Sequence, residues 1–470
     1  MERNEPMTDE LAELRELIPH VWADFAQMKN YYDDPFILDS GDGIYVTDVD
    51  GNRYIDTLAG TASVSVGHCN PVIVEAMVRQ IGKMTFASPN SSVNTASLRL
   101  LKLLLTVVPP GFTTIKFFSG GSEANEGMMK AARQFFWQTG RPNKYKIIGR
   151  FGESVGGTIA CKAAGGVPAK FGPALPGFAH VHPGNIAGGC AYCRHRGATC
   201  DLSCAQAVED TIRAEDPNSV AAVIGAPVGQ TIWPHPEYWP AVRAICDRYD
   251  VLLLYDEIVT GFGRLGTMWG ADFVNAYPDL MGVGKGMSGG YAPLSALLIH
   301  ERVAEAFWGD ENRKFDEGHT FNANPLSAAV GHAVLSYILE HDLVNHARRV
   351  GAHLLERVRT IAERYDAVTE VVGAGLWVAA VLARDPRTGL PAPDGTAFGR
   401  ALHQAGRRHG LLIRPYGSHV LLAPPLTITM TEIDDMVERL DRAMAETFAS
   451  TPLQVPDGHV KTRYPVPARA

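Results

Sequence analysis

Residues 251–257 read Val-Leu-Leu-Leu-Tyr-Asp-Glu, and this stretch decides the fold. The apolar run between Asp250 and Asp256 is typical of a strand that is buried on both faces, as in the parallel sheets of α/β proteins. A carboxylate at the carboxyl end of such a strand lies where open α/β sheets bind their ligands. Asp256 is therefore a candidate functional residue.

A second candidate, Lys285, lies in the glycine-rich run 282–290 (GVGKGMSGG). This much glycine disfavours a regular helix and allows the backbone to approach a bound molecule closely. A lysine in a site that also holds an acid can act as a Schiff-base nucleophile. An isolated lysine on a flexible loop is more often a solvated surface residue. The rest of the chain therefore has to distinguish a functional lysine from a surface lysine.

Patterns of strand and helix alternate along the chain around this stretch. We predict strands at 115–118, 145–149, 220–227 and 292–300, and helices at 71–84, 97–108 and 237–249. A further helix opens within 119–126 and runs to about residue 138. This alternation predicts a doubly wound, mostly parallel sheet flanked by helices. Other patterns indicate a smaller second unit: a hairpin around Asp50-Gly51, strands at 368–382 and 411–422, and an amphipathic helix at 429–447.

Residues 119–126 (SGGSEANE) join the strand at 115–118 to the helix that follows. Gly120, Gly121 and Ser122 then lie at the amino terminus of a helix, where free N–H groups and the helix dipole favour an anion. Many such turns only cap a helix. With Asp256 and Lys285, however, the turn supplies a phosphate site, an acid and an amine, the groups that pyridoxal phosphate needs.

The bulk composition is that of a globular protein. The chain has 470 residues, 46% hydrophobic and 20% charged, with a formal net charge of -8. The negative charge argues against a nucleic-acid partner, and no apolar run reaches the ~20 residues that a membrane span needs. The acidic, polar start without an apolar signal core predicts a cytoplasmic protein.

Longer motifs resemble those of class III pyridoxal-phosphate aminotransferases of fold type I. They are residues 255–264 (YDEIVTGFGR), 284–286 (GKG), 318–325 (GHTFNANP) and 423–426 (APPL). The resemblance runs from about residue 36 to 445. It implies a large cofactor-binding domain at 71–325 and a smaller α+β domain made from both chain ends, 1–70 and 326–470.

The resemblance also implies a role for each matching residue. Lys285 would bind the cofactor as a Schiff base and move the substrate's proton, and Asp256 would pair with the ring nitrogen. Ile258 would pack on the ring, and Gly121 with Ser122 would bind the phosphate. Thr320 would reach the phosphate in the neighbouring subunit, so that a homodimer with shared active sites is implied.

Arg414 matches an arginine that binds a substrate carboxylate in the amine and ω-amino-acid branch, and a guanidinium fits a carboxylate bidentately. A surface arginine at a strand end is the alternative. Val259 stands where amino-acid-specific members often have glutamine, which favours the amine branch. The substrates would then be an amine or ω-amino acid and a 2-oxo acid such as pyruvate.

Three positions depart from the family pattern. Ser154-Val155 replaces the Tyr-His of Tyr-His-Gly, Ala226 replaces the glutamate of Glu-Pro-Val, and Ala62 stands where many amine transaminases have tryptophan. Each change removes bulk or polarity near the expected pocket. The hypotheses are a pocket widened for a bulkier substrate or a changed reaction. An epimerase, racemase or decarboxylase, and a non-catalytic binding protein, remain alternatives.

Four cysteines form two close pairs, Cys190 with Cys193 and Cys200 with Cys204. Such pairs can make a tetrahedral zinc site, although the gap between them is short against the usual zinc spacings. Reduced cysteines that pack a surface insertion are the default interpretation, because seven cysteines in a chain of this length fit a reducing compartment.

Overall fold

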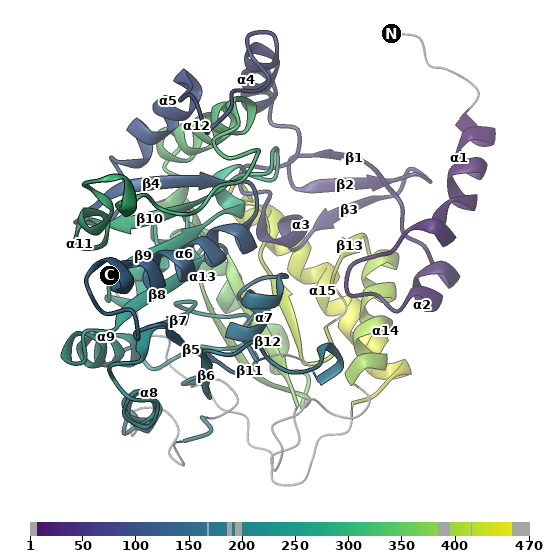
Figure 1. Ribbon diagram of the computed structural model, residues 1–470. Coiled ribbons are helices and arrows are strands. Elements are labelled where there is room, and N and C mark those ends of the chain that lie inside the picture. Colours follow the sequence, from purple (N-terminus) through teal and green to yellow (C-terminus); the bar gives the residue numbers. More distant parts are fainter. Residues whose placement is uncertain are drawn as a thin grey trace.

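The computed structural model describes residues 7–166, 169–185, 190–192, 200–383, 395–414 and 416–453. Within these residues, a seven-stranded sheet in the order β4-β10-β9-β8-β7-β5-β6 forms the centre of the molecule (Figure 1). Its strands are β4 (Phe112–Phe118), β5 (Lys146–Arg150), β6 (Phe178–Val181), β7 (Val220–Gly225), β8 (Leu252–Glu257), β9 (Leu280–Val283) and β10 (Ser295–His300).

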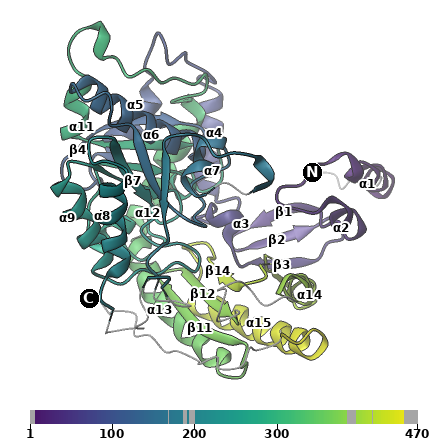
Figure 2. The ribbon, with the colours of Figure 1, turned by 60° about the horizontal axis from the view of Figure 1, so that its bottom comes forward.

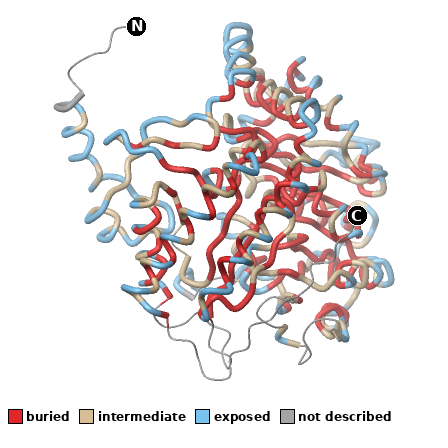
Figure 3. Tube along the Cα trace, turned by 180° about the vertical axis from the view of Figure 1, so that it is seen from behind, coloured by how far each residue is buried: buried red, intermediate tan, exposed pale blue. Residues whose placement is uncertain are grey.

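Strands β6, β5, β7, β8 and β9 run parallel to one another, whereas β10 is antiparallel to both of its neighbours. Every residue of β7 and β8 is buried, because helices cover both faces of a parallel sheet. The buried residues, red in Figure 3, lie in the interior of the molecule. The predicted mostly parallel α/β fold is confirmed.

Several helices cover the sheet. Helix α6 packs against β4, β7, β9 and β10, and α9 leads from β7 into β8. The helices on and beside this sheet are α6 (Gly121–Gln138), α7 (Ile159–Ala164), α8 (Ser203–Ala214), α9 (Tyr238–Arg248), α10 (Gly270–Val274) and α11 (Glu301–Ala304).

Helices α4 (Pro71–Ile81), α5 (Thr95–Leu104) and α12 (Pro325–Glu340) pack together at the top of Figure 1. Asparagine caps begin all three helices, and a proline follows the cap in α4 and α12, where its missing N–H costs nothing. The helix predicted at 97–108 is displaced, because Asn94 accepts the N–H of Ser97 at 2.9 Å and starts α5 earlier.

The two chain ends meet in a smaller α+β part, visible at the right and bottom of Figure 2. Strand β13 pairs in parallel with β3, which confirms the prediction that both ends build this part. One sheet has the order β1-β2-β3-β13 and the other β11-β12-β14. The strands are β1 (Leu38–Asp42), β2 (Tyr45–Asp48), β3 (Arg53–Asp56), β11 (Val368–Ala374), β12 (Trp377–Leu382), β13 (Leu411–Leu412) and β14 (His419–Leu422).

Three longer helices, α13 (Leu343–Ala362), α14 (Gly395–Arg408) and α15 (Met430–Ser450), pack against these sheets. Shorter helices α1 (Met7–Glu16), α2 (Met28–Asp33) and α3 (Ala59–Ala62) belong to the amino-terminal part. No helix in the described ranges is both long and apolar enough to cross a membrane. The domain boundaries at 70/71 and 325/326 stay predictions.

Candidate active site

The end of β8 presents two neighbouring carboxylates to different surroundings, because successive side chains of a strand point to opposite faces. Glu257 accepts the N–H groups of Gly270 at 2.8 Å and Ala271 at 2.6 Å, so it anchors the start of α10. Asp256 is 7% exposed and accepts the N–H of Ile258 at 3.1 Å. Burial raises the pKa of Asp256 to about 7, so this carboxylate is ready to pair with a cationic group.

Lys285 follows β9 and begins a single 3-10 turn, Lys285–Met287. Its φ of 42° lies in the left-handed region that non-glycine residues seldom adopt, a strain that often marks functional sites. Burial lowers the pKa of Lys285 to about 8, although Asp256 acts in the opposite direction. The amine is therefore more often neutral near pH 7 than an exposed lysine, as a nucleophile requires.

The amino terminus of α6 lies beside these groups. The N–H groups of Ser119 and Gly120 both donate to Glu123 Oε2 at 3.0 Å, which closes the start of the helix. Ser122 Oγ accepts the N–H of Gly157 at 2.9 Å, so its own proton is left to donate. A Cβ on Gly156 (φ 148°) would come within 2.6 Å of Ser122 Oγ, so the glycine keeps this turn close to the helix.

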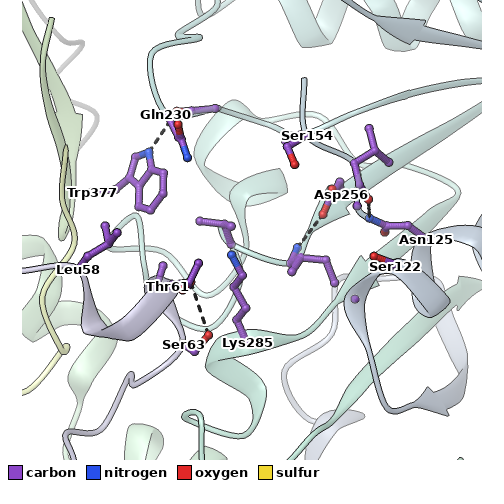
Figure 4. Close-up of a pocket in the computed structure, with 18 of the residues that line it drawn as sticks. Leu58, Thr61, Ser63, Ser122, Asn125, Ser154, Gln230, Asp256, Lys285 and Trp377 are labelled. Atoms are coloured by element: carbon purple, nitrogen blue, oxygen red, sulfur yellow. Dashed lines mark hydrogen bonds between the residues drawn. The ribbon is translucent and has the colours of Figure 1, made fainter. Parts of the chain in front are cut away.

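A cavity of about 940 Å³ brings the predicted residues together. Figure 4 shows Lys285 and Asp256 facing it, with Ser122 and Asn125 on one side and Leu58 and Trp377 on the other. The predicted residues that line it are Ala62, Gly121, Ser122, Ser154, Ala226, Asp256, Ile258, Lys285 and Arg414.

Two predicted residues lie elsewhere. Gly120 caps α6 and does not line the described cavity, and its N–H is already bonded to Glu123. Thr320 is exposed and does not line it either. The roles given to these two residues stay predictions.

The far end of the cavity contains polar and aromatic groups from the carboxyl-terminal part of the chain. The Arg414 guanidinium lies 5.2 Å from the ring centre of Tyr416, and Gln230 Nε2 donates to the Tyr416 hydroxyl at 3.1 Å. Trp377 Nε1 donates to the carbonyl of Gly229 at 3.1 Å. The Arg414 guanidinium can hold a carboxylate of a substrate there.

Several lining residues were missed in the sequence. Asn125 is buried beside Asp256 and donates to the Val155 carbonyl at 2.7 Å, and its position one turn after Ser122 was a usable signal. Glu153 precedes Ser154 and could have been noticed for that reason. Phe25 and Trp377 reach the cavity from distant parts of the chain, and no local pattern indicates them.

The three described cysteines of the two pairs, Cys190, Cys200 and Cys204, do not line the cavity. Cys193 lies outside the described residues. The thiols of Cys190, Cys200 and Cys204 are not in disulfides, and a hydrogen bond with Cys190 and burial together raise the pKa of Cys204. Among the described residues no group of three or more His, Cys, Asp or Glu side chains could hold a metal ion. The zinc hypothesis stays a prediction.

Comparison with known proteins points to one family. The sequence model of the family described as aminotransferase class-III matches residues 27–444. An adenosylmethionine-8-amino-7-oxononanoate aminotransferase of Geobacter sulfurreducens is 31% identical over 437 residues, 90% of this chain and 95% of that relative.

Solved structures agree with the sequence comparison. A thermostable (S)-enantioselective omega-transaminase from Thermomicrobium roseum matches with a TM-score of 0.87 and 31% identity, covering 93% of this chain and 98% of that one. An amine transaminase from an uncultivated Pseudomonas species, solved with pyridoxal phosphate bound, matches with a TM-score of 0.86 and 31% identity, covering 91% of this chain and 98% of that one.

Proposed function

The chain belongs to the class-III aminotransferase family, and from this premise we propose that it transfers an amino group from an amine or ω-amino acid to a 2-oxo acid such as pyruvate. The observation that carries the proposal is the meeting of Lys285, Asp256 and the amino terminus of α6 in one cavity, with Arg414 at its far end. The solved omega-transaminases support the choice of amine donors.

Pyridoxal phosphate is the cofactor of this family, and the residues present fit it. The site has a half-buried lysine with a lowered pKa, a buried carboxylate for the ring nitrogen, and a helix terminus with Ser122 for the phosphate. Asn125 Oδ1 is buried without a hydrogen-bond partner in the part of the chain that the structure describes, so this corner still has a polar atom to satisfy.

When bound, the cofactor supplies a carbonyl carbon that takes up the amino group and a ring that accepts the electrons of the broken Cα–H bond. Asp256, once ionised, would keep a proton on the ring nitrogen. Lys285 Nζ would take the proton from the substrate's Cα and deliver it to the cofactor carbon that has taken up the amino group. Ile258 would pack on the ring, and Ser122 would donate to the phosphate.

A two-stage spectroscopic assay tests this function. The cofactor-loaded protein is mixed with an amine or ω-amino acid alone, and transfer of the amino group is expected to bleach the visible band completely. Pyruvate added after removal of the amine is expected to restore the band. A racemase or epimerase would instead change the optical activity of the substrate without net bleaching, and that result would contradict the proposal.

Substitution of Arg414 by alanine is expected to discriminate between substrate classes. Loss of a charged hydrogen bond costs about 1.5–3 kcal/mol, so KM for an ω-amino acid should rise by about 10- to 100-fold. KM for an amine of equal chain length that lacks the carboxylate should be nearly unchanged. The matched control is Arg407→Ala, which removes an arginine of α14 that pairs with Asp34. Equal effects of Arg414→Ala on both substrates would refute the assignment.

Ser154→Tyr is expected to tighten cofactor retention. Ser154 lines the cavity at the site where the family places an aromatic ring, and ring stacking contributes about 0.5–1.5 kcal/mol, or roughly 3- to 10-fold in the cofactor's dissociation constant. The added ring should also reduce turnover of bulky amines, since Ser154, Ala226 and Ala62 leave that space open. Ser154→Thr is the control, and unchanged retention in the tyrosine variant would contradict the stacking argument.

A homodimer is the proposed assembly. Val78 (63% exposed), Ile81 (54%) and Val93 (77%) form an apolar surface around α4, and the exposed Phe321 pairs with Phe86 at 6.1 Å between ring centres. Apolar patches of this kind are usually covered by a partner, and Thr320 lies next to Phe321, where a second subunit could use it. Sedimentation velocity would show a monomer if this is wrong. The cytoplasmic location stays a prediction.

A further inference from the structure

A buried ion pair lies beside one wall of the cavity, and the mechanism above uses neither member. Arg150, the last residue of β5, is 1% exposed, and Glu153 is 8% exposed. Glu153 Oε2 accepts from Arg150 Nε at 2.8 Å, and its Oε1 accepts from Arg150 Nη2. The guanidinium also lies 4.6 Å from the ring centre of Trp239. The carboxylate is therefore held in one place by two hydrogen bonds.

The pair fixes the end of the neighbouring strand. Glu153 Oε1 accepts the N–H of Ala226 at 3.1 Å, and Arg150 Nη2 donates to the carbonyl of the same residue. A Cβ on Gly225 would come within 2.7 Å of Arg150 Nε, so the last residue of β7 leaves room for the guanidinium. The cavity wall at Ala226, which departs from Glu-Pro-Val, is thus held by a carboxylate from position 153.

Glu153 also lines the cavity that contains Asp256. Its negative charge is one cause of the raised pKa of Asp256, after burial. The other groups facing Asp256 are the amine of Lys285, the amide of Asn125 on α6 and the thiol of Cys161 on α7. Lys285 and Asn125 favour the ionised carboxylate, whereas Glu153 opposes it.

We propose that Glu153 is a positioning residue, held by Arg150, that fixes the wall at Ala226 and controls the charge of Asp256. This inference rests on the proposed role of Asp256 toward the cofactor's ring nitrogen. Glu153 does not take part in proton transfer itself. It decides how acidic the solution can become before Asp256 gains a proton and releases the ring nitrogen.

The test is the pH dependence of cofactor affinity in the full-length protein. The dissociation constant of pyridoxal phosphate is measured from the visible band in Glu153→Gln, Glu153→Asp and the wild type. In the wild type, affinity should weaken as Asp256 takes up a proton. In Glu153→Gln the midpoint of this acidic limb should move to lower pH by about one unit, because a like charge is removed and Arg150 is left uncompensated. Glu153→Asp keeps the charge and should keep the wild-type midpoint.

Asp279→Asn is the matched control. Asp279 is 5% exposed and pairs with Arg243 at 2.9 Å, next to the start of β9, at the opposite end of that strand from Lys285. It should lose stability as Glu153→Gln does, yet keep the wild-type midpoint. If Glu153→Gln does not fold, Arg150→Met with Glu153→Met replaces the pair by apolar groups, which buried pairs often tolerate. The midpoint should then fall by less than expected for Glu153→Gln, because the positive charge of Arg150 is removed together with the like charge.

An unmoved midpoint in Glu153→Gln, or an equal shift in Asp279→Asn, would overturn the inference while leaving the proposed function intact. Failure of the wild-type protein to bind the cofactor would instead contradict the proposed function, and this inference with it.

Discussion

Lys285→Ala is expected to lower kcat for transamination by about 10⁴-fold or more, because the same amine binds the cofactor and moves the substrate's proton. The variant should still fold, since Lys285 lies on a short turn after β9 and its side chain points into a cavity rather than into the core. The substitution does not relieve backbone strain, because alanine at position 285 has to adopt the same φ of 42° as lysine.

Single-turnover kinetics with a saturating amine donor check this result, with cofactor content measured in parallel. Lys146→Ala is the control. Lys146 pairs with Glu215 at the other end of β5 from the cavity, so this variant should keep wild-type turnover. Activity within tenfold of the wild type in Lys285→Ala would show that another group carries the proton.

Asp256→Asn is expected to have two opposite effects. Turnover should fall by about 10³-fold, because a neutral amide cannot keep the ring nitrogen protonated. The cofactor-free protein should become more stable above neutral pH by about 2–4 kcal/mol, because the ionised form of a buried carboxylate is costly.

The sign follows from the pKa of about 7 for Asp256, well above the value in an unfolded chain. Between pH of about 4 and about 7 the folded protein binds the extra proton, so the wild type loses stability as the pH rises. The advantage of the asparagine variant should therefore grow between about pH 4 and about pH 7 and level off above that. Urea unfolding of both cofactor-free proteins measures it; a constant difference across this range would contradict the raised pKa.

Local patterns in the sequence predicted the chemical groups of the site. The apolar strand ending in Asp256, the glycine run around Lys285 and the turn at Gly121-Ser122 each lie within a few residues. Their convergence follows from a parallel sheet, in which the carboxyl ends of the strands lie at one edge. The spacing of motif residues and the periodicity of apolar residues are local properties, so the sequence alone can indicate these groups.

Contacts between distant segments were not predictable in the same way. The pairing of β13 with β3 joins residues 411–412 to residues 55–56. Strand β10 lies between β4 and β9 and runs antiparallel to both. Trp377 reaches the cavity from β12, which pairs with β11 and β14, and Phe25 reaches it from a turn before α2. The contact of Glu153 with the backbone N–H of Ala226 was equally hidden, because a backbone group leaves no mark in the sequence.

The central claim is that Lys285 binds pyridoxal phosphate covalently. Borohydride treatment of the cofactor-loaded protein, followed by proteolysis and peptide mass mapping, tests it most directly. We expect a stable phosphopyridoxyl group on the peptide that contains Lys285, and none on the corresponding peptide of Lys285→Ala. A reduced protein in which that peptide is unmodified would contradict it.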